Sequence, residues 1–443
     1  MGQHALNAIT SEPEKLLAGR AVLGATIGNA LEFYDFVTYS FFAIQIGRAF
    51  FPSENPFTSL MLSVATFGAG FVTRPIGALV IGTYSDRVGR RPAMILSFAL
   101  MGSAIIALAL TPSYDTIGIA APILVITIRL VQGFSLGGEV GPTTAYLMEA
   151  APDDKRGVAV SWQPVSQLIA ATTGALVGVI LSEIMAPESL DLYGWRIAFL
   201  IGAITLPFGL WVRNRMPETL HRAEATQFKH EGNRAITRFN ARLIVLALLI
   251  LASGTIITYV TEYMTTYAEN TLHEATDLAL SVTFVSNGVG VGAALLGGWL
   301  ADRLGRWHVM VWPQAAALLL TYPIFVWIVE TRSAVALLAG LGILSLVGTI
   351  PYSAFYVTLA EGLPKNVRGA AFAIVYAVAI AFFGGTAQVI VTWLLHVTGN
   401  ALAPAWYMIV ATGTGLAAMI LMPETAPHKN RADPGGNVAS PRV

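Results

Sequence analysis

"GTYSDRVGRR" (82–91) and "GGWLADRLGRW" (297–307) both carry the pattern G-x-x-x-D-R-x-G-R. The glycines that begin the pattern, Gly82 and Gly298, lie 216 positions apart in a chain of 443 residues. Each copy is a short charged segment between two long apolar runs. A charged motif that returns at nearly half of the chain length indicates a duplicated unit.

Two further pairs of motifs follow in the same order. "EAAPDDKRG" (149–157) recurs as "EGLPKNVRG" (361–369) at an offset of 212, and "RMPET" (215–219) recurs as "LMPET" (421–425) at an offset of 206. Three pairs in one order at similar offsets are hard to produce by chance. We therefore expect two related halves.

The composition indicates that most of the surface does not face water. The chain is 55% hydrophobic and 12% charged, with a mean hydropathy of +0.64, whereas a soluble domain usually carries about 25% charged residues. The net charge of zero argues against a nucleic-acid partner. No cysteine is present, which excludes disulfide and thiol chemistry. Residues 1–20 lack an apolar core, so we expect no cleaved signal peptide.

Twelve apolar segments are long enough to cross a bilayer, whose core of about 30 Å needs about 20 apolar helical residues. They cover approximately residues 20–47, 57–84, 92–111, 118–148, 157–183, 195–213, 241–268, 278–301, 308–329, 334–361, 369–397 and 403–422. We expect an all-α membrane protein in five parts: an N-terminal segment 1–19, a six-helix bundle 20–213, a linker 214–240, a second six-helix bundle 241–422 and a tail 423–443.

The positions of Lys and Arg predict the orientation. Of the 26 basic residues, Arg48, Arg196 and Arg332 fall in loops on one side, while Arg74 and Arg129 fall inside apolar segments. The other 21 fall on the opposite side, so both termini and the linker are expected in the cytoplasm. The repeated motifs follow the second, fourth and sixth helix of each half, which predicts parallel repeats related by an axis along the membrane normal.

The repeated G-x-x-x-D-R-x-G-R segments are thus cytoplasmic turns, which we interpret as gating loops. Gly82 and Gly298 permit close helix approach, and Asp86 and Asp302 can accept hydrogen bonds from exposed helix N-termini. Five arginines can pair with acids on the facing half or with lipid headgroups: Arg87, Arg90, Arg91, Arg303 and Arg306. The alternative is a plain positive-inside loop, which would explain the arginines but not the repeated Gly and Asp.

These loops resemble the signature of the major facilitator superfamily. Within it, "GNALEFYDFVTYSFFA" (28–43), "RPIGALVIGTYSDRVGRR" (74–91) and "RLVQGFSLGGEVG" (129–141) resemble the metabolite:proton symporter family, which carries citrate, 2-oxoglutarate, shikimate, proline and betaine. "FFPSENPF" (50–57) and "SWQPVSQ" (161–167) resemble the citrate and tricarballylate carriers. The second glycine of "SLGGE" instead matches the 2-oxoglutarate carriers.

Charged residues inside apolar segments point to the transport site, because each costs at least about 2.5–3.5 kcal/mol at the bilayer centre unless it is paired or hydrated. There are six of them: Glu32, Asp35, Arg74, Arg129, Glu139 and Glu262. No P-loop, ligand-spaced metal cluster or G-x-S-x-G elbow accompanies them. We therefore expect no enzyme activity, metal or cofactor, and energy from an ion gradient.

Asp35 and Arg129 are expected to form an ion pair. Sugar–proton symporters of the superfamily have an analogous acid on helix one, the proton site, and an arginine on helix four. Separating such a pair favours proton uptake by the buried acid, which would couple transport to protons. The alternatives are a permanent structural ion pair, or Glu32 as the proton site, since two acids three residues apart can share one proton. Sodium stays open as the coupling ion.

Arg74 can bind a substrate carboxylate bidentately or hold Glu32 or Glu139 in place. For Glu139 we favour a structural or relay role over substrate contact. Further polar residues recur at helical spacing and extend the candidate substrate site: Asn29, Tyr34, Gln163, Gln167, Tyr259, Glu262, Tyr263, Thr266, Tyr352 and Tyr356. His396 has no assigned role, and aromatic stripes such as Tyr352 and Tyr356 are equally consistent with packing.

We expect a monomeric, proton-coupled importer of a small organic acid in the bacterial inner (plasma) membrane, with citrate or another tri- or dicarboxylate as substrate. The six deep charges sum to −2 if all are ionised, which conflicts with a bare tricarboxylate unless acids or the substrate are protonated. The same sum suits a zwitterion such as betaine or proline without protonation. An antiport exporter is a further alternative, as is a membrane receptor that transports nothing.

Overall fold

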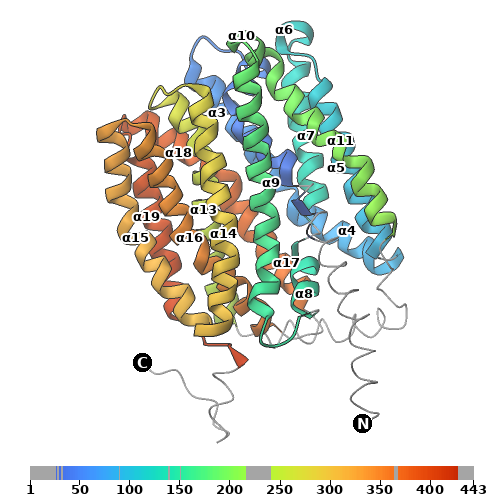
Figure 1. Cartoon of the computed structure of the whole chain (residues 1–443). Coiled ribbons are helices and arrows are strands. Elements are labelled where there is room, and N and C mark those ends of the chain that lie inside the picture. Colours follow the sequence, from blue (N-terminus) through green and yellow to red (C-terminus); the bar gives the residue numbers. More distant parts are fainter. Residues whose placement is uncertain are drawn as a thin grey trace, which may run out of the picture.

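The computed structural model describes residues 26, 29–30, 33–88, 90–137, 140–149, 151–215, 241–363 and 368–427, and every regular element in these ranges is a helix. Figure 1 shows them as a bundle of long helices running in roughly one direction. Eight helices are long and apolar enough to cross a membrane, and shorter apolar helices accompany them in the described part of the chain.

The N-terminal half supplies six crossing segments. Their bounds are residues 33–41 with α2 (Ala43–Phe50); α3 (Pro56–Val72) with α4 (Arg74–Val88); α5 (Arg90–Leu110); α7 (Ala120–Leu136) with α8 (Val140–Glu149); α9 (Arg156–Ile184); and α11 (Trp195–Arg215). The short α6 (Tyr114–Ile117), α10 (Pro187–Ser189) and π-helix η1 (Leu190–Gly194) lie in connections.

The C-terminal half supplies six more. They are α13 (Ala241–Asn270), α14 (Thr276–Leu304), α15 (Arg306–Thr331), α16 (Ala334–Gly362), α17 (Arg368–Ala379) with π-helix η2 (Ile380–Gly384) and α18 (Gly385–Thr398), and α19 (Ala403–Ile420). The all-α fold with twelve crossing segments is therefore confirmed. The division at the linker stays a prediction, because residues 216–240 lie outside the described ranges.

Two helices start at a residue whose side chain satisfies a free backbone N–H group. Asn55 accepts a hydrogen bond from Phe57 N at 3.0 Å, with Pro56 as the first residue of α3. Ser333 likewise accepts from Ala336 N at 3.1 Å at the start of α16. These polar caps lie at helix ends, as expected where the chain leaves the apolar core of a membrane.

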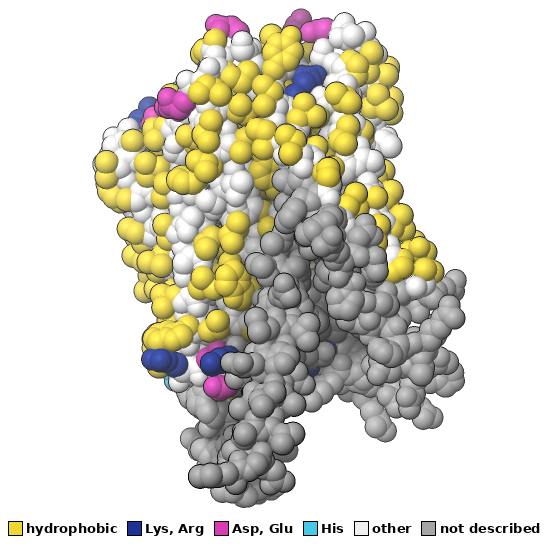
Figure 2. Space-filling model, turned by 45° about the vertical axis from the view of Figure 1, so that its right-hand side comes forward, with side chains coloured by type: hydrophobic (Ala, Val, Ile, Leu, Met, Phe, Trp, Pro, Cys, Tyr) yellow, Lys and Arg dark blue, Asp and Glu magenta, His cyan; other side chains and the backbone are white. Residues whose placement is uncertain are grey.

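The outer surface fits a hydrocarbon surrounding. On the face in Figure 2, apolar side chains form a broad band, and the coloured charged groups lie toward its two ends. Large apolar side chains on the sides of the bundle are open, such as Leu319 and Ile204, each 75% exposed. A continuous apolar surface of this extent indicates contact with lipid rather than water.

Several helix pairs join the two halves, and three of them are the most extensive. Helix α9 packs along α14, α3 packs against α18, and α8 packs against α17; the α9–α14 pair can be followed in Figure 1. The second, fourth and eleventh crossing segments are each composed of two helices that meet near mid-length, at Thr73, at Gly137 and at η2. These junctions lie beside the buried charges described next.

Candidate functional site

Arg74 and Arg129 come from two neighbouring segments whose backbones nearly touch. A Cβ on Gly133 of α7 would lie 1.5 Å from the carbonyl oxygen of Gly70, and a Cβ on Gly137 would lie 2.0 Å from that of Arg74. Thr73 also donates from Oγ1 to the Leu130 carbonyl at 2.6 Å. Only glycine permits this approach, which brings the two arginines to the same place.

The ring of Phe36 contacts both guanidinium groups. The Cζ atom of Arg74 is 4.4 Å from the ring centroid of Phe36, and that of Arg129 is 4.5 Å from it. Arg74 also stacks on Phe71 at 4.3 Å, and Arg129 on Tyr39 at 4.5 Å. Such cation–π contacts partly offset the loss of hydration of a buried cation.

Each guanidinium keeps one edge free of hydrogen bonds. Arg74 is 3% exposed and Arg129 is 0% exposed, yet Nε and one terminal nitrogen of each have no partner among the described residues. That edge carries two parallel N–H donors and matches one carboxylate bidentately. The two arginines together therefore offer two carboxylate-binding edges.

Asp35 and Arg129 do not pair directly, which corrects our expectation. Gln132 stands between them: its Oε1 accepts from Arg129 NH1 at 2.6 Å, and its Nε2 donates to Asp35 Oδ2 at 2.7 Å. Gln132 lies one helical turn after Arg129 on α7. The amide of Gln132, and not the guanidinium of Arg129, therefore contacts the carboxylate of Asp35. The sequence "RLVQG" contained this spacing, but a neutral amide does not stand out in an apolar segment as a charge does.

The C-terminal half contributes Glu262 on α13. It is 5% exposed, and its Oε2 has no partner among the described residues. It interacts electrostatically with Arg74 without forming a close ion pair. Tyr259, one turn earlier on α13, packs edge-on against Phe71 at 5.0 Å. Arg74 therefore lies where the two halves meet.

Two of the predicted substrate-binding residues, Gln167 and Tyr356, meet through Tyr376 where the two halves touch, and two more, Gln163 and Asn29, lie within the N-terminal half. Gln167 of α9 donates to the hydroxyl of Tyr376 on α17 at 3.4 Å, and Tyr376 packs against Tyr356 at 6.4 Å between centroids. Gln163 is buried, with both amide atoms lacking a partner in the described part of the chain. Asn29 donates to Ser166 Oγ at 2.6 Å and thereby ties the first helix to α9.

Three other candidates, Tyr34, Tyr352 and Tyr263, form hydrogen bonds within one half; their contact with substrate stays a prediction, and for Tyr352 these bonds favour the packing alternative. The hydroxyl of Tyr34 donates to the Ala198 carbonyl of α11 at 3.0 Å. That of Tyr352 lies 2.9 Å from Ser253 Oγ and 3.2 Å from Gln314 Nε2 inside the C-terminal half, and Tyr263 bonds to Thr392.

Several predicted residues cannot be placed by their side chains. Glu32 and Glu139 lie outside the described residues. Gly82, Asp86 and Arg87 lie on α4 and Arg90 begins α5, but the description of these positions extends to the backbone only.

The second gating loop reaches across to the N-terminal half. Asp302 Oδ1 accepts from Gly157 N at 2.8 Å, and Oδ2 accepts from Val158 N at 3.0 Å. Asp302 therefore caps the N-terminus of α9, where negative charge is favoured. A Cβ on Gly298 would lie 2.5 Å from the carbonyl oxygen of Gly157, so the two helices touch there.

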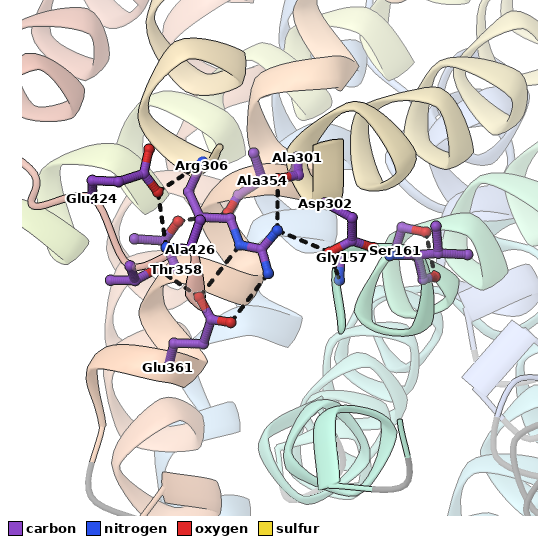
Figure 3. A network of polar contacts seen from close by, with 12 residues as sticks. Gly157, Ser161, Ala301, Asp302, Arg306, Ala354, Thr358, Glu361, Glu424 and Ala426 are labelled. Carbon is purple, nitrogen blue, oxygen red and sulfur yellow. Dashed lines mark hydrogen bonds and ion pairs between the residues drawn. The ribbon is translucent and has the colours of Figure 1, made fainter. Parts of the chain in front are cut away.

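Arg306 is buried and, among the described residues, pairs within its own half, so neither of the expected partners, an acid on the facing half or a lipid headgroup, is found for it. It donates to Asp302 Oδ1 at 2.8 Å and to the two carboxylate oxygens of Glu361 at 3.2 and 3.3 Å (Figure 3). Glu424 accepts from Arg306 N at 2.9 Å and from Trp307 N at 3.1 Å, and so caps α15. The three motifs that recur in the sequence thus converge on one network, and Asp302 links that network to the other half.

Arg303 lies away from this interface. Its guanidinium stacks on Trp299 at 4.1 Å, and its side chain is exposed. Among the described residues, no acid of the facing half forms an ion pair with Arg303. Pairing with a facing acid or with a lipid headgroup therefore stays a prediction.

The halves also touch on the opposite side of the arginines. A Cβ on Gly68 of α3 would lie 2.2 Å from the carbonyl oxygen of Gly385 on α18. Gln388 donates to Ser40 Oγ at 2.5 Å, and the rings of Phe57 and His396 stack 3.7 Å apart. The described residues therefore enclose the buried charges between contacts on both sides.

Comparisons with known proteins agree with this architecture. The family model described as Major Facilitator Superfamily matches residues 25–387. A citrate-proton symporter of Salmonella typhi is 37% identical over 411 residues, which cover 91% of this chain and 93% of the relative. A proline/betaine transporter of Escherichia coli is 29% identical over 423 residues, covering 92% and 84%.

The fold has solved counterparts. The xylose transporter XylE from E. coli, in a partially occluded inward-open conformation, superposes with a TM-score of 0.72. The match covers 92% of this chain and 98% of the transporter at 17% sequence identity, which supports the fold alone.

Proposed function

The chain belongs to the Major Facilitator Superfamily, and from this premise we propose that it imports a small organic acid together with protons. Citrate or another tri- or dicarboxylate is the proposed substrate. Import would proceed by alternating access, in which the two halves rock about a site that they share. We place the protein in a bacterial plasma membrane, as a monomer with both termini in the cytoplasm, because one chain supplies both halves and its basic residues favour that orientation.

The observation that carries this proposal is the pair of unoccupied arginine edges. Arg74 and Arg129 each hold two N–H donors without a partner in the described part of the chain. Buried donors left unpaired cost roughly 1–3 kcal/mol each, so donors of this kind are suited to an anion that supplies the acceptors. Two such edges on guanidinium groups that both contact Phe36 match a substrate with at least two carboxylates.

Charge balance links anion binding to protons. Asp35 and Glu262 oppose Arg74 and Arg129, so the four described groups sum to zero when ionised. A fully ionised tricarboxylate would add three negative charges to a poorly hydrated site. Proton uptake by Asp35, by Glu262 or by the substrate reduces this excess, and it favours entry of anion and proton together.

A zwitterion such as betaine or proline is the second candidate, and the neutral sum of the four charges favours it. A quaternary ammonium group is best held by free aromatic faces. Here Phe36 and Phe71 already carry guanidinium groups on their faces. Because these two aromatic faces already hold guanidinium groups, the site favours a carboxylate substrate over a quaternary ammonium group.

Uptake into proteoliposomes tests the proposal. Labelled citrate should accumulate when an inward proton gradient is imposed, and it should not accumulate when a sodium gradient replaces it. Unlabelled succinate, 2-oxoglutarate, tricarballylate, proline and betaine then compete with citrate. Competition by betaine and proline but by no carboxylate would replace the main proposal with the second candidate. Accumulation driven by outward gradients alone would indicate an exporter.

A further inference from the structure

Gln132 can bridge Asp35 and Arg129 in only one orientation. A guanidinium group has donors and no acceptor, so the atom 2.6 Å from Arg129 NH1 must be the amide oxygen. The amide nitrogen therefore faces Asp35, and Asp35 Oδ2, at 2.7 Å, must accept. This arrangement suits an ionised Asp35, whose oxygens are acceptors only.

A proton on Asp35 conflicts with this bridge. On Oδ2 it would turn the acceptor into a donor that faces the N–H of Gln132. On Oδ1 it would leave a buried hydroxyl without an acceptor, because Oδ1 has no partner in the described residues. Rotation of the amide resolves the conflict at Asp35, but it turns the amide N–H toward Arg129, where two donors cannot bond.

We propose that Gln132 is a positioning residue that transmits the protonation of Asp35 to Arg129 and thereby couples proton uptake to anion binding. The proposal rests on the proposed function. Protonation releases NH1 of Arg129, whose Nε and NH2 already lack partners among the described residues, so the whole guanidinium becomes available to a carboxylate. By linkage, a bound carboxylate that takes Arg129 from Gln132 favours the protonated form of Asp35 by the same factor. Proton uptake by Asp35 and binding of the anion therefore favour each other, as symport requires.

Other charged or titratable groups surround this chain of bonds without replacing it. They are Tyr34 and Tyr39 on the first helix, Arg74 beyond Phe36, and Tyr259 and Glu262 on α13. Among the described residues, it is Gln132 that donates a hydrogen bond to a carboxylate oxygen of Asp35. Arg129 is the cation whose charge acts on Asp35, and the amide of Gln132 bonds to both groups.

Two substitutions separate positioning from a structural role. Gln132→Leu removes both bonds and leaves Arg129 free at every pH, so citrate affinity should lose most of its dependence on pH. Gln132→Glu accepts from Arg129 permanently, so citrate affinity should fall about tenfold or more at neutral pH, as expected for a lost charged contact. Gln314→Leu is the matched control, because Gln314 is an equally buried amide that bonds to Ser253, Tyr352 and the Thr412 carbonyl.

The experiment measures equilibrium binding of labelled citrate to the purified full-length protein at acidic and at neutral pH. Comparing variants at one pH cancels the ionisation of citrate itself. The proposal predicts that the ratio of the two affinities shrinks about tenfold in Gln132→Leu and is unchanged in Gln314→Leu. An unchanged ratio in Gln132→Leu, or equal losses of affinity in the Leu and Glu variants, would overturn it.

A second readout is independent of the substrate. The infrared carbonyl band of a protonated carboxylic acid, identified by its absence in Asp35→Asn, gives the fraction of Asp35 that is protonated as pH varies. Without citrate, Gln132→Leu should shift this titration to higher pH, because the carboxylate loses a donor. If wild-type protein binds no citrate but the titration shifts, the substrate proposal fails and the role of Gln132 stands. An unshifted titration removes that role.

Discussion

Gly68 and Gly385 touch backbone to backbone across the two halves, since a Cβ on Gly68 would lie only 2.2 Å from the Gly385 carbonyl oxygen. Gly157 and Gly298 repeat this relationship near the ends of α9 and α14 that we propose to face the cytoplasm, where the corresponding distance is 2.4 Å. Arg74 lies between these two glycine contacts. Each pair is therefore a contact that must open when the adjacent side of the transporter opens, and a larger side chain at either contact would hold that side apart.

Gly157→Leu should hold the cytoplasmic side open. The added side chain would collide with the backbone of Gly298 and displace Asp302 from its N–H donors. The chain has no cysteine, so Ser161→Cys, at a buried position next to this contact, gives a single thiol reporter. Labelling of this introduced thiol by a membrane-impermeant maleimide from the cytoplasmic side should rise severalfold. Unchanged labelling would show that the two helices accommodate the leucine at 157 while the cytoplasmic side stays closed.

Gly68→Leu should have the opposite effect and hold the outer side open. Ser40 is buried and accepts from Gln388 on the facing half, so Ser40→Cys reports on this side. Labelling from outside should rise in Gly68→Leu and stay low in Gly157→Leu. If both glycine variants raise labelling at both reporters, the substitutions loosen the whole fold and the two contacts are not separate gates.

The fold could be predicted from the sequence because hydrocarbon imposes simple rules on it. Apolar length fixed each crossing segment to within a few residues, as for α16 over Ala334–Gly362 against an expected 334–361. The junctions at Thr73 and η2 were not foreseen, since helix-to-helix contacts rather than hydropathy determine them. The cap formed by Asp302 was foreseen from its acidic type next to a helix end, but its partner helix was not.

The site was predicted less completely for a related reason. Asp35, Arg74, Arg129 and Glu262 could be identified because a buried charge is costly. That argument does not show which neutral side chain lies between two charges, so Gln132 was missed. The partners of Arg306 were misassigned because sequence repeats identify equivalent positions and not contacts. Only the three-dimensional structure shows Glu361 and Glu424 meeting at the same residue.

Asp302→Asn should slow cycling more than it weakens binding. The substitution keeps one acceptor for the N-terminus of α9, but it removes the negative charge that faces both this helix end and Arg306. Loss of a cap interaction costs about 0.5–2 kcal/mol, which shifts the balance toward the inward-open form by roughly 2- to 30-fold. Stopped-flow exchange and equilibrium binding of citrate check this. A large loss of affinity with normal exchange would indicate that the loop acts in recognition.

Asp35→Asn should abolish accumulation driven by a proton gradient while sparing part of the exchange of internal for external citrate. An amide cannot take up the transported proton, yet it fits the same space and can still accept from Gln132. Counterflow in proteoliposomes without a gradient measures the exchange, and uptake under an inward proton gradient measures coupling. Wild-type accumulation in Asp35→Asn would move the obligatory proton site to another acid, with Glu262 the next candidate among the described residues.

Arg74 and Arg129 should differ in how their loss depends on pH. Arg74→Ala removes one carboxylate-binding edge but leaves the bonds among Asp35, Gln132 and Arg129 intact, so citrate affinity should fall about 10- to 150-fold at every pH, the equivalent of roughly 1.5–3 kcal/mol for one charged contact. Arg74→Lys should recover only part of the lost affinity, because an ammonium group lacks the planar fork.

Arg129→Ala also leaves Asp35 without its cation in a poorly hydrated site, so Asp35 should hold its proton more firmly and proton release should limit turnover. Equilibrium binding at acidic and neutral pH, combined with the rate of proton release on substrate exit, distinguishes the two arginines. If Arg74→Ala binds citrate normally while Arg129→Ala loses it at both pH values, Arg129 alone holds the substrate and Arg74 instead positions Glu262.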